Sequence, residues 1–228
     1  MRTVLKVMAF ACIFALVSCG KKNTETITVD DSFSYFPIDS TKQFIYALDS
    51  IAYNKNLNRI DTFSFQLKTV FEESFLDRNN VKTWRLARFA KYKESLPFVE
   101  VQNHFVQFVD NKLLYTDDNY VLLKAIFPVK SGNVWNGNLY NALDKINSTV
   151  DYKNETFQVA DTSFENTIKI TEWNNLDFIF ENNRFSVYQN KVGLVYFRNK
   201  NIETQINQGK EEVSGYDITQ KLIAVQPR

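Results

Sequence analysis

The feature that most constrains the fold of this chain is an alternation of apolar and polar residues with a period of two. Residues 62–68 alternate without a fault, and residues 164–171 alternate nearly as well. This pattern predicts strands with one face in a core and the other in water. Weaker strand candidates are residues 44–53, 98–109, 120–127, 157–160, 178–181, 185–197 and 218–225.

The breaks between these segments are rich in Asn and Asp, which tolerate left-handed backbone and suit hairpin turns. We therefore expect an all-β fold with few short helices: a curved, mainly antiparallel sheet, either a half-barrel or a barrel. Residues 81–93 fit a strand or a short basic helix equally well, and residues 138–147 are compatible with a helical turn or two.

A faint internal repeat suggests two similar halves. Phe36-Pro37 is followed eight residues after the phenylalanine by Phe44, and Phe127-Pro128 is followed at the same spacing by Trp135. The alternative is chance combined with the frequent use of Phe-Pro before strands. The repeat places the halves at residues 33–120 and 124–228.

The beginning of the chain has the pattern of a bacterial lipoprotein signal. Arg2 and Lys6 precede an uncharged apolar run over residues 7–17, which is too short to span a bilayer. The run ends in a segment that resembles a lipobox, the motif cut before a cysteine whose thiol takes diacylglycerol: Leu16, Val17, Ser18 and Cys19. The alternatives are an ordinary secretory signal or an N-terminal membrane anchor. The expected parts are a signal peptide (1–18), a flexible tether (19–32) and a single β-rich domain (33–228).

Charge and cysteine content restrict the function of the remaining chain. Removal of residues 1–18 takes away two of the 27 basic residues and none of the 26 acidic ones, so no net charge is available to attract nucleic acid. The two cysteines, Cys12 and Cys19, both fall in the signal region, which leaves the domain without a disulfide or a reactive thiol. The 20 Phe, 11 Tyr and 3 Trp residues must therefore supply the core.

Three segments resemble a group of uncharacterised lipoproteins from Bacteroidota-type bacteria. They are Ser18-Cys19-Gly20-Lys21-Lys22, the F-P-x-x-x-G-x-x-W segment of residues 127–135 and the V-G-x-V segment of residues 192–195. The first Phe-Pro copy departs from this pattern, because Thr41 stands where the second copy has Gly132. The resemblance implies a lipid-anchored envelope protein and no reaction. In such bacteria an acidic run just after the lipidated cysteine resembles a surface-export signal. This chain has Gly20-Lys21-Lys22-Asn23 there instead, so the resemblance implies an outer-membrane protein that faces the periplasm.

The sequence predicts no catalytic residue, metal site or cofactor. His104 is the single histidine, and its spacing from Glu100 and Gln102 predicts a solvent-facing position. No Gly-x-Ser-x-Gly motif, His/Cys cluster or Gly-rich phosphate loop is present. The adjacent carboxylates 72–73, 117–118 and 211–212 would point to opposite strand faces.

Two groups of side chains are candidates for binding. One strand face is apolar and is either part of a ligand-binding lining or simply core: Phe63, Phe65, Leu67 and Phe71. A basic run either contacts anionic lipid head groups or forms the solvated side of an edge strand: Arg78, Lys82, Arg85, Arg88 and Lys91.

These features predict a non-enzymatic lipoprotein that serves as an interaction or structural module of the cell envelope. One alternative is a periplasmic carrier or chaperone for lipid or lipoprotein, which requires an apolar cavity. A second alternative is a glycan hydrolase, which requires two carboxylates roughly 5–10 Å apart in a cleft. The expected partners are the membrane, through the lipid anchor, and other envelope proteins or a lipid, but no nucleic acid.

Overall fold

A computed structural model describes residues 31–207 and 209–228 and shows an all-β domain. The predicted signal peptide, its cleavage residues and Cys19 lie outside the described residues. Within the described residues one short 3-10 helix, η2, precedes twelve strands. Their bounds are η2 (Ser32–Tyr35), β1 (Lys42–Asn54), β2 (Arg59–Leu76), β3 (Lys82–Lys91), β4 (Val99–Val109), β5 (Lys112–Asp117), β6 (Tyr120–Ile126), β7 (Val134–Asn136), β8 (Asn147–Val159), β9 (Thr162–Leu176), β10 (Phe180–Gln189), β11 (Gly193–Asn207) and β12 (Lys210–Pro227). No helix within this part of the chain is long and apolar enough to cross a bilayer.

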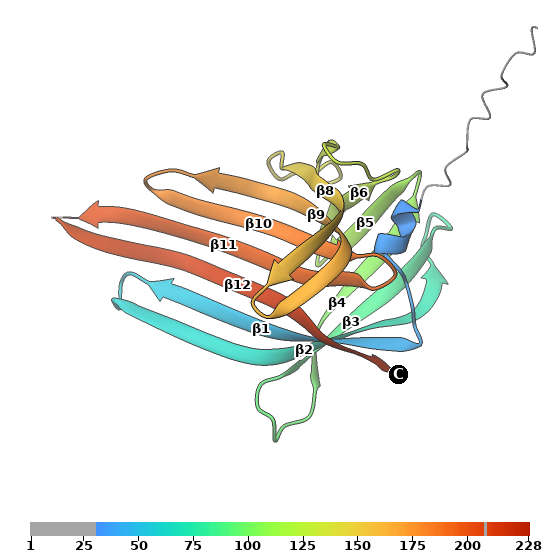
Figure 1. The fold of residues 1–228 in the computed structure, drawn as a ribbon, viewed down its shortest axis with the longest axis horizontal. Helices are drawn as coiled ribbons and strands as arrows, with labels where there is room; N and C mark the ends of the chain where they lie inside the picture. Colours follow the sequence, from blue (N-terminus) through green and yellow to red (C-terminus); the bar gives the residue numbers. More distant parts are fainter. Residues whose placement is uncertain (1–30, 208) are drawn as a thin grey trace, which may run out of the picture. The chain divides into compact units, whose positions relative to one another are not determined.

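The twelve strands form one antiparallel sheet that curls into a nearly closed barrel (Figure 1). Consecutive strands pair with each other except β6 and β7, and β1 also pairs with β12, which joins the first strand to the last. The sheet therefore runs from β6 through β1 and β12 to β7. The prediction of an all-β, curved, mainly antiparallel fold is confirmed.

The seam of the barrel lies between β6 and β7. The backbone N–H of Leu123 donates to Gly137 O at 2.8 Å, and Trp135 Nε1 donates to Leu123 O at the same distance. Asn141 Nδ2 donates to Val121 O at 3.1 Å, so the Asn-rich loop after β7 covers the edge of β6. Unpaired strand edges promote aggregation, and these bonds protect this one.

The curvature of the sheet has a local cause in its bulges and turns. Register shifts leave extra residues in β2, β4, β11 and β12, among other strands, and such bulges bend a strand. The prediction that Asn and Asp form the turns is confirmed at Asn80, Asp110, Asn111 and Asp118, which have positive φ angles. It is wrong for residues 174–175, 182–183 and 198–201, which lie within β9, β10 and β11.

Several local predictions can be compared with the strands. Most of residues 81–93 form a strand, β3, rather than a helix. Residues 138–143 form turns and bends, and residues 144–147 lead into β8 without a helix. The prediction of a single strand over residues 185–197 is wrong, because a turn at residues 190–192 separates β10 from β11. Its sequence, Asn-Lys-Val, carries no proline or glycine, and the chain reverses there through positive φ angles at Lys191 and Gly193.

Each half of the sheet begins after a Phe-Pro pair. Phe36-Pro37 precedes β1, and Phe127-Pro128 precedes β7, so each pair leads into a run of six strands. The rings of Phe36 and Phe127 meet edge to face with centroids 5.7 Å apart. The two Phe-Pro segments therefore lie together in the core cluster beside η2.

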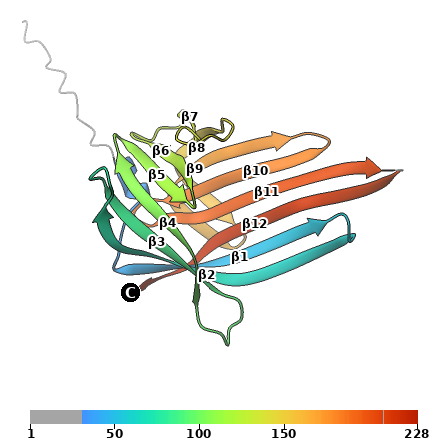
Figure 2. The same cartoon turned by 180° about the vertical axis from the view of Figure 1, so that it is seen from behind.

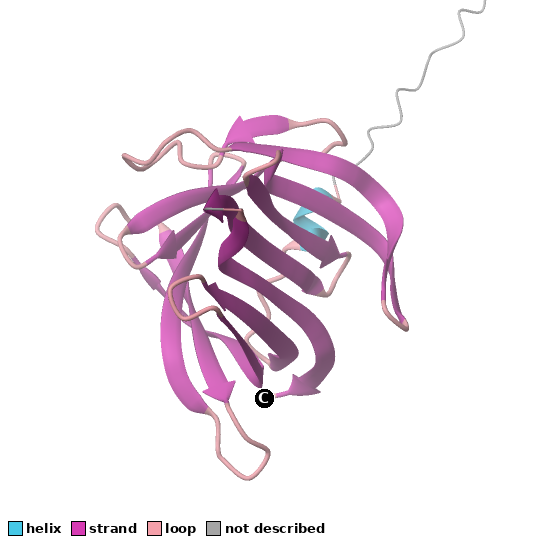
Figure 3. Ribbon diagram, turned by 90° about the vertical axis from the view of Figure 1, so that its left-hand side faces the viewer, coloured by secondary structure: helices cyan, strands magenta, loops and turns pink. Residues whose placement is uncertain are grey.

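The two ends of the barrel differ. One end contains η2, and the side chains of its Ser32 and Tyr35 are fully buried. The aromatic side chains around Phe36 and Phe127 cluster at the same end. At the other end the hairpins β1–β2, β9–β10 and β11–β12 extend beyond the rest of the sheet (Figures 1 and 2). Figure 3 looks along the barrel from this hairpin end, with η2 on the far side of the strands.

Candidate functional site

A cavity of about 420 Å³ lies inside the barrel, between strands β1–β6 on one side and β10–β12 on the other. Small-molecule sites typically range from about 300 to 1,000 Å³, so this cavity has room for a compact ligand. Side chains alternate between the two faces of a strand, and the lining residues of one strand are accordingly spaced by two, as Thr69 and Phe71 on β2 or Leu86 and Arg88 on β3 are. The barrel interior is thus only partly filled by its own core.

The part of the cavity nearest η2 is apolar. Strands β1, β3 and β5 start at this end, and β2, β4 and β6 finish there, so their residues near η2 converge on it. The apolar lining consists of Phe36, Ile38, Phe44, Phe71, Leu86, Val106, Leu113, Val192 and Leu194. This end can bury the hydrocarbon part of a ligand.

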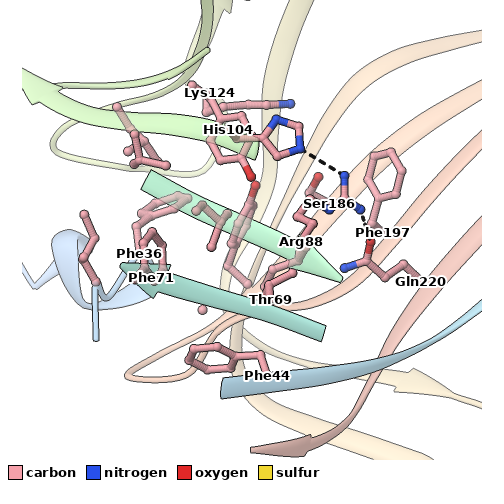
Figure 4. A pocket seen from close by; sticks show the side chains of 18 of the residues that line it. Phe36, Phe44, Thr69, Phe71, Arg88, His104, Lys124, Ser186, Phe197 and Gln220 are labelled. Atoms are coloured by element: carbon pink, nitrogen blue, oxygen red, sulfur yellow. Dashed lines mark hydrogen bonds between the residues drawn. The ribbon is translucent and has the colours of Figure 1, made fainter. Parts of the chain in front are cut away.

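The part of the cavity nearest the projecting hairpins is polar and charged. Its lining includes Arg88, His104, Asp117, Lys124, Arg184, Ser186, Asn199 and Gln220. Arg88 stands two residues beyond Leu86 on β3, so an apolar and a charged side chain follow each other on the same strand face. Figure 4 shows Phe36, Phe44 and Phe71 at one side of the cavity and Arg88 and His104 at the other. The cavity is therefore amphipathic along its length.

Three charged side chains form one cluster at this polar end, in which Lys124 and Glu172 are largely buried and Arg184 is partly exposed. Lys124 Nζ lies 2.5 Å from Glu172 Oε1, and Arg184 Nε lies 2.6 Å from Glu172 Oε2. Burial raises the pKa of Glu172, but the charges of Lys124 and Arg184 outweigh that effect and hold the pKa below its ordinary value. Glu172 is therefore ionised at neutral pH and forms ion pairs with both cations.

Arg88 and His104 form a second polar group. Arg88 Nη1 lies 3.0 Å from Gln102 Oε1 and 3.1 Å from His104 Nε2, and Arg88 Nη2 lies 3.3 Å from Gln220 Oε1. Burial, and then the charge of Arg88, lowers the pKa of His104 to about 4, although Asp117 opposes this shift. His104 is neutral at pH 7. Because arginine only donates, Nε2 accepts and the ring proton is assigned to Nδ1.

The prediction that His104 faces solvent is wrong, because the residue is only 2 % exposed. Its alternation with Gln102 holds, and both side chains point toward the cavity side of β4. The predicted alternation does not extend to Glu100. A β-bulge at Val101 pairs Gln102 with Arg88 and Glu100 with Phe89, so the side chain of Glu100 lies on the outer face.

The predicted apolar ligand face divides into different environments. Of its four residues, Phe71 lines the cavity and Leu67 belongs to the core at 2 % exposure. Phe65 is half-buried against Tyr92, with ring centroids 5.1 Å apart, and Phe63 is exposed toward the hairpin end of β2.

The predicted basic surface is likewise divided. Arg78 is exposed in the turn between β2 and β3, and Lys82 lies over the ring of Trp84.

Two further basic residues lie on the outer side of β3. Arg85 pairs with Glu72 and Glu100, and Lys91 pairs with Glu94. Arg88 is three residues from Arg85 and so has the opposite orientation, into the barrel.

Sequence reasoning missed Lys124, Glu172 and Arg184. A signal was present for one of them: Lys124 is the single charged residue of β6, whose other residues are Tyr, Val, Leu, Leu, Ala and Ile. A charge in such a strand is buried unless the strand lies at an edge, and a buried charge needs a partner. The partner, Glu172, is 48 residues away in sequence and gave no local signal.

The cluster has little of what hydrolysis of a glycan requires. A general acid in such enzymes has a raised pKa, whereas the pKa of Glu172 is lowered. Asp117 accepts a hydrogen bond from Gln102 at 2.7 Å and contacts His104. Among residues 31–207 and 209–228 no group of three or more His, Cys, Asp or Glu side chains is arranged to hold a metal ion.

Comparisons with protein-family models, with curated proteins and with solved structures found no match for this chain. The function is therefore inferred from the site itself.

Proposed function

We propose that this protein is a lipid-anchored envelope protein that binds a small amphipathic molecule inside its barrel and carries it at the periplasmic face of the outer membrane. The amphipathic cavity is the observation that supports the proposal: an apolar lining near η2 is followed along the same strands by charged and polar side chains. Attachment to the membrane rests on the sequence around Cys19.

The energetics favour a ligand that has a hydrocarbon part. Each methylene group moved from water into the apolar end contributes about 0.8 kcal/mol. The phenylalanines at this end surround the cavity from β1, β2 and the segment after η2, which gives a ligand contacts on several sides. A wholly polar ligand would leave this surface without apolar contacts, and a wholly apolar one would leave the charged end without polar contacts.

Native mass spectrometry combined with solvent extraction tests this proposal on a soluble form that spans residues 25–228. We expect a co-purified lipid-like molecule near one equivalent. Leu86→Trp fills the cavity and should remove the bound mass, whereas Phe105→Trp, on the outer face of β4, should retain it. A clean protein mass, together with no binding of added fatty acids or detergents, would contradict the proposal.

An interaction module remains the second candidate function, because the projecting hairpins carry exposed apolar side chains. Leu176, Phe178 and Ile206 are 76, 103 and 81 % exposed. A photo-crosslinkable phenylalanine analogue at position 178 should then give one discrete adduct in intact cells. The same analogue at Val134, which is exposed on β7, is the control and should give none. Equal labelling at both positions would dismiss this function.

A further inference from the structure

We propose that the ligand carries a single carboxylate and that this group docks on the guanidinium of Arg88. The inference rests on the proposed ligand-binding function and specifies the chemistry of the ligand. It follows from three observations: which donors of Arg88 are still available, which cations of the cavity already have carboxylate partners, and where Arg88 lies relative to the apolar end.

The hydrogen bonds of Arg88 leave one edge of its guanidinium available. The group has five N–H donors in a planar fork. Three of them are directed to protein acceptors: two from Nη1, to Gln102 and His104, and one from Nη2, to Gln220. Within the described part of the chain no residue accepts from Nε–H or from the second Nη2–H. In a guanidinium, Nε–H and one Nη2–H share an edge of the fork, and such an edge matches the two oxygens of a carboxylate.

The charges of the cavity also single out Arg88. Lys124 and Arg184 share the carboxylate of Glu172. Arg88 has no carboxylate oxygen within 4.0 Å among the described residues, and Asp117 reaches it only through Gln102 and His104. The three cations therefore outnumber the two carboxylates by one. An uncompensated charge away from water is costly, and a bound monoanion balances it.

The neutral state of His104 strengthens this arrangement. An imidazolium beside Arg88 would repel it and leave Nη1 without an acceptor, whereas the neutral ring accepts a bond through Nε2. Together with Gln102, the ring holds the Nη1 side of the guanidinium against β4. The free edge is thereby oriented, and Arg88 needs little reorganisation when an anion binds.

The position of Arg88 explains why the ligand should be an amphiphile rather than a free anion. Leu86 precedes it by two residues on the same face of β3, which corresponds to about 7 Å along the strand toward η2. Phe71 pairs with Leu86 across β2 and β3, and Phe44 lines the same end. A carboxylate on Arg88 thus directs an attached hydrocarbon chain into the apolar part of the cavity.

Calorimetric titration of the protein with molecules that share one tail and differ in head group tests the proposal. The probes are decanoate, decanol, decyltrimethylammonium and decyl phosphate. At neutral pH decanoate should bind about 10- to 100-fold more tightly than decanol, since hydrogen bonds to charged groups exceed neutral ones by this much. Arg88→Gln should remove this preference and leave decanol binding unchanged. Arg85→Gln, on the outer face of the same strand, is the matched control and should behave as the wild type.

The possible results test the head-group assignment and the ligand-binding function separately. Equal affinity of the wild type for decanoate and decanol overturns the head-group assignment but leaves the ligand-binding function intact. Tighter binding of decyl phosphate than of decanoate overturns the choice of a carboxylate. Binding of none of the probes overturns both proposals. The wild-type comparison does not depend on a variant, so the assignment stays testable even where Arg88→Gln fails to fold.

Discussion

Replacement of Glu172 by Gln should destabilise the fold strongly, because one carboxylate compensates two cations. Its oxygens lie 2.5 Å from Lys124 Nζ and 2.6 Å from Arg184 Nε, and its side chain is only 11 % exposed. Removal of one partner from a buried ion pair costs about 3–5 kcal/mol. Since Arg184 is 30 % exposed and partly screened by water, we expect the lower end, about 3 kcal/mol.

Urea denaturation followed by tryptophan fluorescence measures this loss. With an m-value of about 2 kcal/mol per molar urea, the midpoint should fall by about 1.5 M. Glu73→Gln is the control, since this carboxylate is exposed and makes no ion pair within 4 Å among the described residues, and it should stay within about 0.5 kcal/mol of the wild type. Addition of Lys124→Met to Glu172→Gln should recover part of the loss, because one uncompensated cation is removed. A midpoint for Glu172→Gln equal to that of the control would refute the reasoning.

Three further predictions concern other parts of the chain. Gly215→Ala should lower the free energy of unfolding by about 2–4 kcal/mol in urea denaturation, because φ is +122° and a Cβ would lie 2.0 Å from Asn201 O. Gly132→Ala, at φ +83° with no neighbouring atoms, should lower it by about 1 kcal/mol, and equal losses would contradict the clash. The pKa of His104 is about 4 in the folded protein, against an ordinary value of 6.5 for a histidine in the unfolded chain, so the unfolded chain takes up the proton first as the pH falls. Stability should therefore decline from pH 6.5 to 4, and the decline should be shallower in His104→Asn; parallel profiles would argue against a buried neutral ring. Cys19→Ser should leave an uncut precursor without lipid in membrane fractions by intact mass, and normal maturation would overturn the lipoprotein prediction.

The sequence predicts the fold class and many turns because both depend on local interactions. The alternation of residues 62–68 falls within β2, and Asn80, Asp110, Asn111 and Asp118, which were predicted in turns, adopt the left-handed backbone that few other residues tolerate. The Phe-Pro pairs at residues 36–37 and 127–128 precede the two runs of strands. Each of these signals is contained in a stretch of a few residues.

The candidate site was not predictable in the same way, because alternation says which residues share a face but not which face is inside. Arg85 and Arg88 belong to the same basic run, yet one pairs with acids on the outer surface and the other lines the cavity. The prediction for His104 assumed that the alternation of side chains continues to Glu100, but the bulge at Val101 reverses it. Bulges carry little sequence signal, so their positions emerge only from the paired structure.

The cavity itself depends on contacts between distant segments. Lys124 and Glu172 lie in β6 and β9, which do not pair with each other, and they meet only because the sheet curls. The same holds for the available edge of Arg88, whose Nη2 is held by Gln220 from the last strand. Burial and the positions of polar partners inside a barrel are therefore properties of its closure.

The pairing of β1 with β12 has a consequence for how the chain folds. Gln43 and Gln226, which touch across these strands, are 183 residues apart in sequence. Such pairing gives the fold a high contact order, and folding of this kind is slow because a long loop must close before its contacts form. The barrel cannot be completed during synthesis until the last strand is available. A chain that ends before residue 210 would present β1 and β11 as unpaired edges, prone to aggregation.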